Sequence, residues 1–365
     1  MRSGMFLTPT LIVSTSAIIA NWKLLREQFT GRETGGVVKA DAYGLGMVPV
    51  ANALAEAGCD TFFVATLEEG IALREALPDR RILVFHGVQP GEEFAFRQHR
   101  LIPVLNSQEQ LTRWKPVAKE FAHAVSALHI DTGMGRLGLQ PLEFEALLKH
   151  DSALLSDCRV GLIMSHLACA PEAEHPLNGE QLNWFNHARS LVPEIPASLC
   201  NSGGVFLDKH FHFDLARPGC SLYGIAPQLI ADNPMQQVAT WTAPMIMLRT
   251  LEREQTVGYG ATMTLPKGTK IATVASGYAD GFLRHARDAV AYIGEHQVPL
   301  VGTVTMDMLC FDVTDVPGEL LVEGALFELL GDRDGIRVDD LAQRAHTIGY
   351  EILTRIGSRV MRVYE

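Results

Sequence analysis

From residue 11 to about residue 224, short apolar runs alternate with stretches of helical hydrophobic spacing. The apolar runs are continuous and do not alternate with polar residues, which is typical of strands buried on both faces. This pattern favours a parallel sheet covered by helices, and about eight such units predict a closed TIM-like (β/α)8 barrel of the α/β class. Helical spacing is clear at residues 49–57 and 67–77, where Glu68, Glu69 and Arg74 are predicted to face outward. The predicted strands are residues 36–39, 61–65, 82–86, 101–105, 127–131, 160–166 and 197–201.

The composition and the hydrophobic pattern of the sequence change after Pro227. Strands rich in valine, threonine, isoleucine and glycine follow, and the only long helical period is near residues 338–345. A chain of 365 residues also exceeds the usual size of one compact domain. We therefore predict a barrel at residues 11–228 and a C-terminal mainly-β domain at residues 235–365, joined by residues 227–234. Residues 1–10 are expected to pair with this second domain.

Composition and charge exclude several classes of protein. The formal net charge of −11 comes without a basic stripe, so neither nucleic acid nor a polyphosphate is an expected partner. The apolar runs are too short to span a membrane, and polar residues interrupt the apolar stretch 6–20, so a secretory signal is not predicted. The six cysteines stand singly and lack the spacing of zinc or redox motifs. We expect reduced thiols, no metal site and a cytoplasmic protein.

Lys39 is the strongest candidate for a reactive residue. It ends an apolar run and is followed by small residues and two glycines, so a buried strand delivers an amine to a loop. Desolvation there favours the neutral, nucleophilic amine that a Schiff base with an aldehyde cofactor requires. The alternative for this pattern alone is a strand whose lysine reaches solvent.

Other polar groups also follow predicted barrel strands, where the active sites of such barrels form. Arg136, His166 and Ser202 have this placement, and Arg217 precedes a Pro-Gly pair near the end of the barrel segment. Each has an ordinary alternative, because a lone histidine is more often a core residue and a lone arginine a surface ion-pair partner. The glycine-rich segments 201–204 and 219–220 offer main-chain amides that would bind a phosphate dianion, although turns need glycine in any case.

In the second half, Tyr259 stands between two glycines, where a turn can expose a phenol at little steric cost. The segments 277–281 and 302–307 are punctuated by glycine in the same way. The alternative for each is an ordinary hairpin.

Together these segments resemble the alanine racemase family, fold-type III enzymes that use pyridoxal 5'-phosphate. The resemblance extends from residue 37 to residue 353 in both predicted domains. Its specific motifs are VVKADAYG at 37–44, DTGMGRLG at 131–138, RPG at 217–219, LYG at 222–224, GYGAT at 258–262, GYADG at 277–281, MD at 306–307 and TIGYEIL at 347–353.

The resemblance implies a cofactor, a set of site residues and an assembly. Lys39 would hold pyridoxal phosphate covalently, and Lys39 and Tyr259 would be the two bases on opposite faces of the substrate Cα. Arg217 would face the pyridine nitrogen and His166 would link it to the phenol. The active site would be shared across a head-to-tail homodimer. The remaining matches are the phosphate contacts Tyr43, Ser202, Gly219, Cys220 and Tyr350, the substrate-carboxylate contacts Arg136 and Met306, and the substrate-entrance residues Tyr278 and Arg284.

Three positions depart from the family pattern. His129 stands where many relatives carry a carbamylated lysine that orients the carboxylate-binding arginine, and a histidine cannot carry that group. A bound anion such as chloride, or a nearby side chain, is the hypothesis for how Arg136 is held instead. Thr303 replaces an arginine on the substrate path, and Leu45 replaces a common histidine.

The predicted activity is interconversion of L- and D-alanine, a small amino-acid substrate, to supply D-alanine for peptidoglycan. A broad-specificity, serine or lysine racemase of the same fold is the nearest alternative. A non-catalytic carrier of pyridoxal phosphate is an alternative of a different class, but such proteins lack the β domain and its tyrosine. A fold-type III decarboxylase would pair the pyridine nitrogen with a carboxylate, and Arg217 argues against it.

Overall fold

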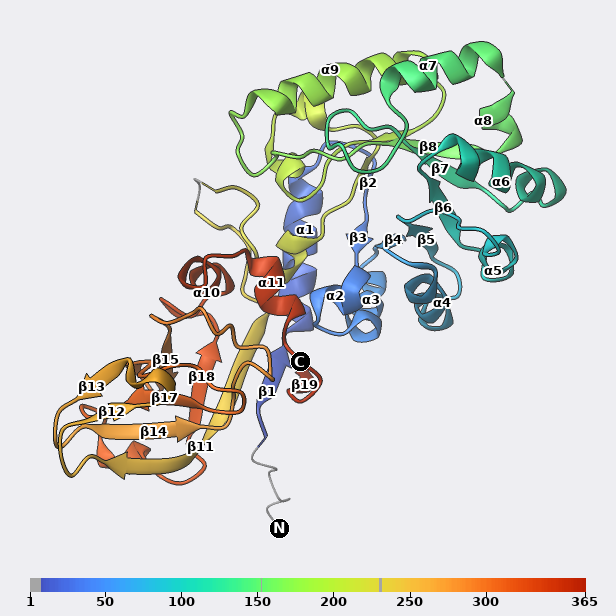
Figure 1. Cartoon of the computed structure of the whole chain (residues 1–365). Helices are drawn as coiled ribbons and strands as arrows, with labels where there is room; N and C mark the ends of the chain where they lie inside the picture. The colour runs from blue at the N-terminus through green and yellow to red at the C-terminus, as the bar shows by residue number, and fades with distance from the viewer. Residues whose placement is uncertain (1–7, 152, 230–231) are drawn as a thin grey trace.

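The structure is a computed structural model that describes residues 8–151, 153–229 and 232–365. It has a helix-covered barrel and a lobe built mainly of strands (Figure 1). The predicted pairing of residues 1–10 with the second domain falls mostly on residues 1–7, which lie outside the described residues, as do residues 230–231 of the predicted joint.

The barrel is formed by parallel strands in chain order, as predicted. Strands β3 to β9 form one parallel sheet, and β10 pairs in parallel with β2, which directly precedes β3. Main-chain hydrogen bonds from Asp214 to Ala197 and from Gly35 to Ala216, both 2.9 Å, close the ring. The strands are β2 (Glu33–Thr34), β3 (Gly36–Val37), β4 (Thr61–Val64), β5 (Arg81–Val84), β6 (Ile102–Leu105), β7 (Ser126–His129), β8 (Val160–Met164), β9 (Ala197–Ser198) and β10 (Leu215–Ala216).

Helices surround this barrel and bury their apolar faces against its strands. A separate apolar cluster, which includes Phe63, Val104 and Met164, fills the barrel interior. The helices are α1 (Thr15–Gln28), α3 (Met47–Glu56), α4 (Leu67–Ala76), α5 (Glu93–Gln98), α6 (Gln108–Glu120), α7 (Pro141–His150), α8 (Leu154–Asp157) and α9 (Pro176–Ser190), with the short turn α2 (Lys39–Tyr43) after β3. The shorter 3₁₀ turns are η1 (Gly203–Phe206), η2 (Lys209–Phe211), η3 (Cys220–Tyr223), η4 (Tyr259–Ala261) and η5 (Gly318–Leu320).

The C-terminal part is mainly β, as predicted. Its sheet has the order β16–β15–β18–β11–β1–β19, with β14 and β17 continuing from β11. The predicted helix near residues 338–345 is present as α10 (Val338–Arg344), followed by α11 (Gly349–Thr354). The strands are β11 (Ala239–Thr250), β12 (Gln255–Val257), β13 (Met263–Leu265), β14 (Lys270–Val274), β15 (Val290–Ile293), β16 (His296–Pro299), β17 (Leu309–Asp312), β18 (Leu326–Leu330) and β19 (Met361–Tyr364).

The domain limits predicted from the sequence need correction in one respect. Strand β1 (Thr10–Val13), which the prediction placed largely in the barrel, lies between β11 and β19 in the C-terminal sheet. Its alternate side chains Leu11 and Val13 are fully buried there. The chain therefore starts in the β lobe and then enters the barrel through α1 (Figure 1). Within the described residues, no helix is long and apolar enough to cross a membrane.

The outward orientation predicted for one helix is only partly correct. On α4, Glu68 is exposed, but Arg74 is half-buried and donates hydrogen bonds to several main-chain carbonyls, including that of His99 at 2.9 Å. Glu69 forms a capping box with Thr66 and also reaches the loop that carries Lys39. Hydrophobic spacing identifies the buried face of a helix, but it does not reveal polar side chains that serve main-chain groups at the helix ends.

Candidate active site

A cavity of about 380 Å³ lies at the carboxyl ends of the barrel strands. Its wall is formed by loops that follow the strands, which is where the catalytic groups of such barrels are placed. Tyr350 reaches it from α11 of the C-terminal part. All nine residues that the sequence predicted for this end of the barrel line the cavity: Lys39, Tyr43, Arg136, His166, Ser202, Arg217, Gly219, Cys220 and Tyr350.

Lys39 projects an amine into this cavity. The strand β3 ends at Val37, so Lys39 begins the following turn and does not end the strand as predicted. Its Nζ lies 5.8 Å from the centroid of the Phe85 ring. Burial lowers the pKa of Lys39, and the positive charge of Arg136 lowers it further. Both effects favour the neutral amine, the form that attacks an aldehyde.

The loop that carries Lys39 has an unusual backbone. Four consecutive residues, 40–43, have φ between 52° and 57°, the left-handed region that costs non-glycine residues roughly 1–2 kcal/mol each. Hydrogen bonds hold this turn in place: the amide of Ala40 donates to Glu69 Oε1 at 2.7 Å, and the amide of Met47 donates to Asp41 Oδ1 at 2.6 Å. Arg362 of β19 donates to the carbonyl of Gly44 at 3.0 Å. The strain is therefore concentrated beside the reactive amine and is supported from two other elements.

The far wall of the cavity forms a cradle for an anion. The main-chain amides of Gly219 and Ser221 converge on Ser202 Oγ, at 3.0 and 3.3 Å, a nest geometry that suits phosphate oxygens. A Cβ on Gly219 would lie 2.6 Å from the hydroxyl of Tyr43, so only glycine leaves room for that phenol. Tyr350 Oη donates to Cys220 Sγ at 3.2 Å. Two phenols and the Ser202 hydroxyl thus face one small space.

Arg217 is buried beneath the cavity with only 3% of its surface exposed. Its guanidinium donates to the hydroxyl of Ser198 and to the carbonyl of Ser165. Burial lowers the pKa of Arg217 to about 10, so the group stays positively charged at neutral pH. Burial and this charge hold the pKa of His166 well below its ordinary value. Within the described residues the His166 ring makes no hydrogen bond, so its link to Arg217 and a phenol stays a prediction.

His129 is held by a single hydrogen bond, between its Nδ1 and Asn106 Oδ1 at 2.9 Å. The amide group of Asn106 donates to two main-chain carbonyls, which leaves Oδ1 as the acceptor and makes His129 Nδ1 the donor. His129 Nε2 is therefore an unprotonated, buried acceptor without a partner among the described residues. Burial and Arg217 lower the pKa of His129 to about 4, and Arg136 acts in the same direction. A neutral ring therefore stands at this position, which agrees with the expectation that a histidine cannot supply a negative group here.

Apart from Tyr350, the predicted residues of the C-terminal part do not line this cavity within one chain. Tyr259 is 75% exposed on the turn between β12 and β13, and Met306 is 52% exposed. Tyr278 and Arg284 line a different depression, beside α11. The Thr303 hydroxyl donates to the Tyr259 carbonyl at 3.1 Å, so this departure from the family pattern supports the tyrosine turn. Within one chain the cavity therefore contains Lys39 but not Tyr259, the predicted second base.

Sequence reasoning missed several residues that shape the site. Phe85 lies beside the lysine amine, and Thr354 lines the cavity from α11. Glu69 positions the lysine loop, and the Thr66–Glu69 spacing of a capping box was a signal for it. Asn106 fixes the tautomer of His129, and no local pattern marks it. Contacts between loops of different strands leave no trace in one sequence.

Comparisons with known proteins agree along the whole chain. The family model for the N-terminal domain of alanine racemase matches residues 13–227, and the model for its C-terminal domain matches residues 238–364. An alanine racemase of Rhodospirillum rubrum is 48% identical over 361 residues, covering 98% of this chain and 96% of that protein.

Solved structures give the same result. The alanine racemase of Bartonella henselae, with covalently bound pyridoxal phosphate, has a TM-score of 0.91 at 34% identity and covers 98% of this chain and 99% of its own. The biosynthetic alanine racemase of Pseudomonas aeruginosa has a TM-score of 0.87 at 34% identity, with the same coverage of both chains. Since both family models and these relatives span nearly all residues, the chain belongs to the alanine racemase family.

Proposed function

We propose that this protein is a pyridoxal-phosphate-dependent isomerase that interconverts L- and D-alanine. The observation that carries the proposal is the pairing of the Lys39 amine, whose pKa is lowered, with an anion cradle in one cavity of about 380 Å³. An aldehyde that also bears a phosphate needs both groups at once. Membership of the alanine racemase family supports the choice of alanine as the substrate.

The residues present fit this cofactor. Lys39 would hold it covalently, and Tyr43, Ser202, Gly219, Cys220 and Tyr350 would hold its phosphate. The Ser202 hydroxyl accepts from two main-chain amides and so keeps its own O–H to donate to such a group, and the glycine at 219 keeps the cradle open. When bound, the cofactor would supply an electron sink that makes the Cα proton of an attached amino acid acidic.

Proton transfer would then need one base on each face of the substrate. Lys39 would hold or release the proton on one face, since burial and Arg136 lower its pKa and so favour the neutral amine. The phenol of Tyr259 would serve the other face. Arg217 stays charged with a pKa of about 10 and would keep the adjoining ring nitrogen largely unprotonated. A weaker electron sink favours proton exchange over transamination.

The substrate carboxylate would be bound by Arg136 and the main-chain amide of Met306. Arg136 lines the cavity, and no hydrogen bond of its side chain is found within the described residues, so its donors are free for a carboxylate. A planar guanidinium matches the two oxygens of such a group. Tyr278 and Arg284 would lie along the path by which the substrate enters.

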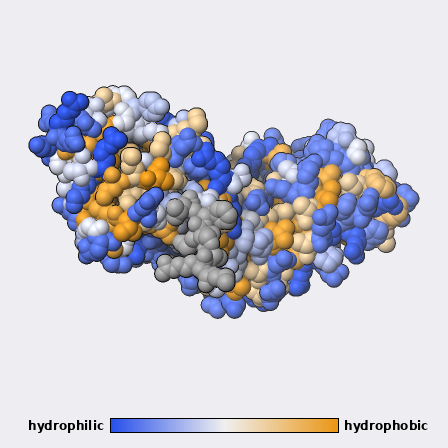
Figure 2. Space-filling model, turned by 90° about the horizontal axis from the view of Figure 1, so that it is seen from below, coloured by the Kyte–Doolittle hydropathy of each residue, from blue (hydrophilic) through white to orange (hydrophobic). Residues whose placement is uncertain are grey.

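We further propose a homodimer in which each barrel cavity receives Tyr259 and Met306 from the partner. Figure 2 displays hydrophobic side chains gathered on one face of the C-terminal lobe. Large apolar residues of that lobe are unusually exposed for a monomer, which is typical of an interaction surface. They include Ile246, Met247, Leu248, Met306, Met308 and Tyr259.

The proposed role of the protein is to work in the cytoplasm and supply D-alanine for peptidoglycan. The six cysteines, all within the described residues, form no disulfide, which is compatible with a reducing compartment.

The activity is tested by incubating the purified protein and pyridoxal phosphate with single L-amino acids and separating the enantiomers. We expect L-alanine to reach equal amounts of both enantiomers faster than L-serine or L-lysine does. Faster conversion of serine or lysine would contradict the alanine assignment, and no conversion of any amino acid would contradict the enzyme assignment.

A further inference from the structure

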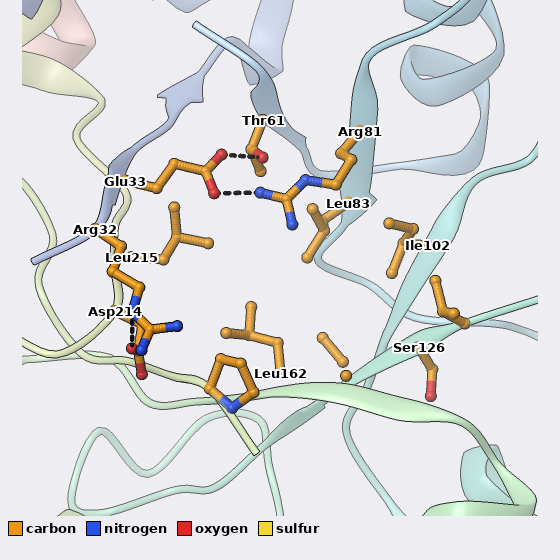
Figure 3. A pocket seen from close by; sticks show the side chains of 14 residues that line it. Arg32, Glu33, Thr61, Arg81, Leu83, Ile102, Ser126, Leu162, Asp214 and Leu215 are labelled. Atoms are coloured by element: carbon orange, nitrogen blue, oxygen red, sulfur yellow. Dashed lines mark hydrogen bonds and ion pairs between the residues drawn. The ribbon is translucent and has the colours of Figure 1, made fainter. Parts of the chain in front are cut away.

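A second cavity of about 400 Å³ lies at the opposite end of the barrel, where its strands begin. Residues at or beside the start of each barrel strand except β3 line it, and it shares no lining residue with the cavity that contains Lys39. Figure 3 shows this pocket with its lining side chains around an open centre. A volume of this size is in the usual range for small-molecule sites.

The pocket is open because two strands place small residues there. Ala127 of β7 and Gly161 of β8 both line it. A Cβ built on Gly161 meets no atom within 4 Å, and the backbone of this residue is not in the left-handed region. Neither the backbone conformation nor the neighbouring atoms require glycine at this position, and its effect is to leave space at the barrel mouth.

The floor of the pocket is apolar and its rim is charged. Leu83, Leu162 and Leu215 form the floor, and these leucines belong to the apolar cluster of the barrel interior. On the rim, Arg81 pairs with Glu33, and Arg32 Nε lies 3.5 Å from Asp214 Oδ1. Such a site matches a ligand with an apolar body and one polar end.

The hydrogen-bonding capacity of the rim decides the charge of that polar end. Both oxygens of Glu33 are engaged, one by Arg81 and the other by the hydroxyl of Thr61. Asp214 accepts from the Ala197 amide at 2.9 Å in addition to its pairing with Arg32. The two arginines have N–H groups to spare, because each has five donors and only one partner within the described residues. Figure 3 shows guanidinium nitrogens of both directed toward the open centre.

We propose that this pocket binds a small aliphatic monocarboxylate. The carboxylate accepts hydrogen bonds from the free N–H groups of Arg81 and Arg32, and the aliphatic tail packs on the leucine floor. Arginine is well suited to hold a carboxylate at such a rim because its planar N–H groups match two oxygens. A zwitterionic amino acid is disfavoured, because the two rim carboxylates are already engaged by other donors.

The test is a calorimetric titration of the cofactor-loaded enzyme with hexanoate. We expect saturable binding of hexanoate and binding at least about tenfold weaker for hexanamide, which lacks the charge, and for acetate, which lacks the tail. If hexanamide binds as tightly as hexanoate, or if leucine binds more tightly than hexanoate, the assigned class of ligand is overturned. The absence of hexanoate binding would overturn the site itself.

Two variants locate the binding. Gly161→Leu fills the pocket and should abolish hexanoate binding. Arg81→Gln should weaken hexanoate binding at least about tenfold by removing one charged donor. Arg253→Gln is the matched control, since Arg253 is an exposed arginine of the C-terminal lobe, and it should leave binding unchanged. Alanine racemisation should be unchanged in all three. Hexanoate binding that survives Gly161→Leu and Arg81→Gln would place the ligand elsewhere and overturn the proposal.

Discussion

At the scale of single residues, burial lowers the proton affinity of the basic groups around the cavity. Lys39, His129, His166 and Arg217 all have a lowered pKa, and burial is the largest cause for each. All four are cationic when protonated, and the charge of Arg136 also lowers the pKa of the lysine and of both histidines, so the cavity favours neutral bases and an anionic ligand.

Lys39→Ala should abolish the absorbance near ~420 nm that marks a covalently held pyridoxal phosphate, whereas Tyr259→Phe should retain it and lose racemisation. The reason is that in the proposed mechanism only Lys39 forms the covalent link, while both residues transfer protons. Absorption spectra and enantiomer analysis of the two variants measure this. Racemisation by the phenylalanine variant would mean that the second base is another group.

His129 should make the protein less stable as the pH falls. Its pKa is about 4 in the folded chain and ~6.5 when unfolded, so between these values the unfolded chain binds the additional proton. Above pH ~6.5 the contribution of this histidine to the free energy of unfolding should be fully retained. Between pH ~6.5 and pH about 4, the free energy of unfolding should fall by up to about 1.4 kcal/mol per pH unit because of this proton.

Denaturant unfolding at several pH values measures this slope. His129→Gln should reduce this slope by the contribution of roughly one bound proton, and the contribution of His166 should remain. His150→Gln, at an exposed position on α7, is the control and should preserve the wild-type slope. A slope in His129→Gln equal to that of wild type would contradict the lowered pKa.

At the scale of elements, the sequence predicted the barrel strands well and their ends poorly. Continuous apolar runs identified seven of the strands, because burial on both faces leaves that mark. Strand β10 has only two residues and was not identified by its own run. Predicted strands ran past the true ends at Lys39, His166 and Asn201, since apolar and small residues continue into the loops that line the cavity.

The left-handed turn after Lys39 could not be predicted, because its residues 40–43 contain no glycine. What holds it are partners distant in sequence, chiefly Glu69 and Arg362. The same is true of the pair formed by His129 and Asn106, which joins the ends of two strands. By contrast, the glycine at 219 was predicted as part of an anion cradle, and the structure gives it a steric reason.

Glu69→Ala should destabilise the protein by about 1–2 kcal/mol, because it removes both a capping box and the acceptor for the Ala40 amide. It should also lower the pKa of Lys39 further, since the carboxylate of Glu69 raises it. Denaturant unfolding and the pH dependence of kcat measure the two effects. Glu75→Ala, an exposed position on the same helix, is the control; an equal loss of stability in both variants would contradict this role for Glu69.

At the scale of the whole molecule, one chain holds the two halves of the proposed site apart. The lysine cavity opens at the barrel end near α2 and α11, whereas the β12–β13 turn with Tyr259 lies out on the β lobe (Figure 1). Motif spacing identified both halves but could not show their separation, because distance in space is not encoded in the order of motifs. The proposed homodimer would bring the two halves together in each cavity.

In the proposed homodimer, the amine and the phenol of one active site belong to different chains. Mixing two inactive variants tests this arrangement most directly. Lys39→Ala and Tyr259→Phe are each expected to be inactive, and unfolding and refolding them together allows mixed dimers to form. One cavity of each mixed dimer would then be intact, so alanine racemisation should recover to roughly a quarter of the wild-type level. If the mixture stays inactive although mixed dimers have formed, both bases must come from one chain, and the account is contradicted.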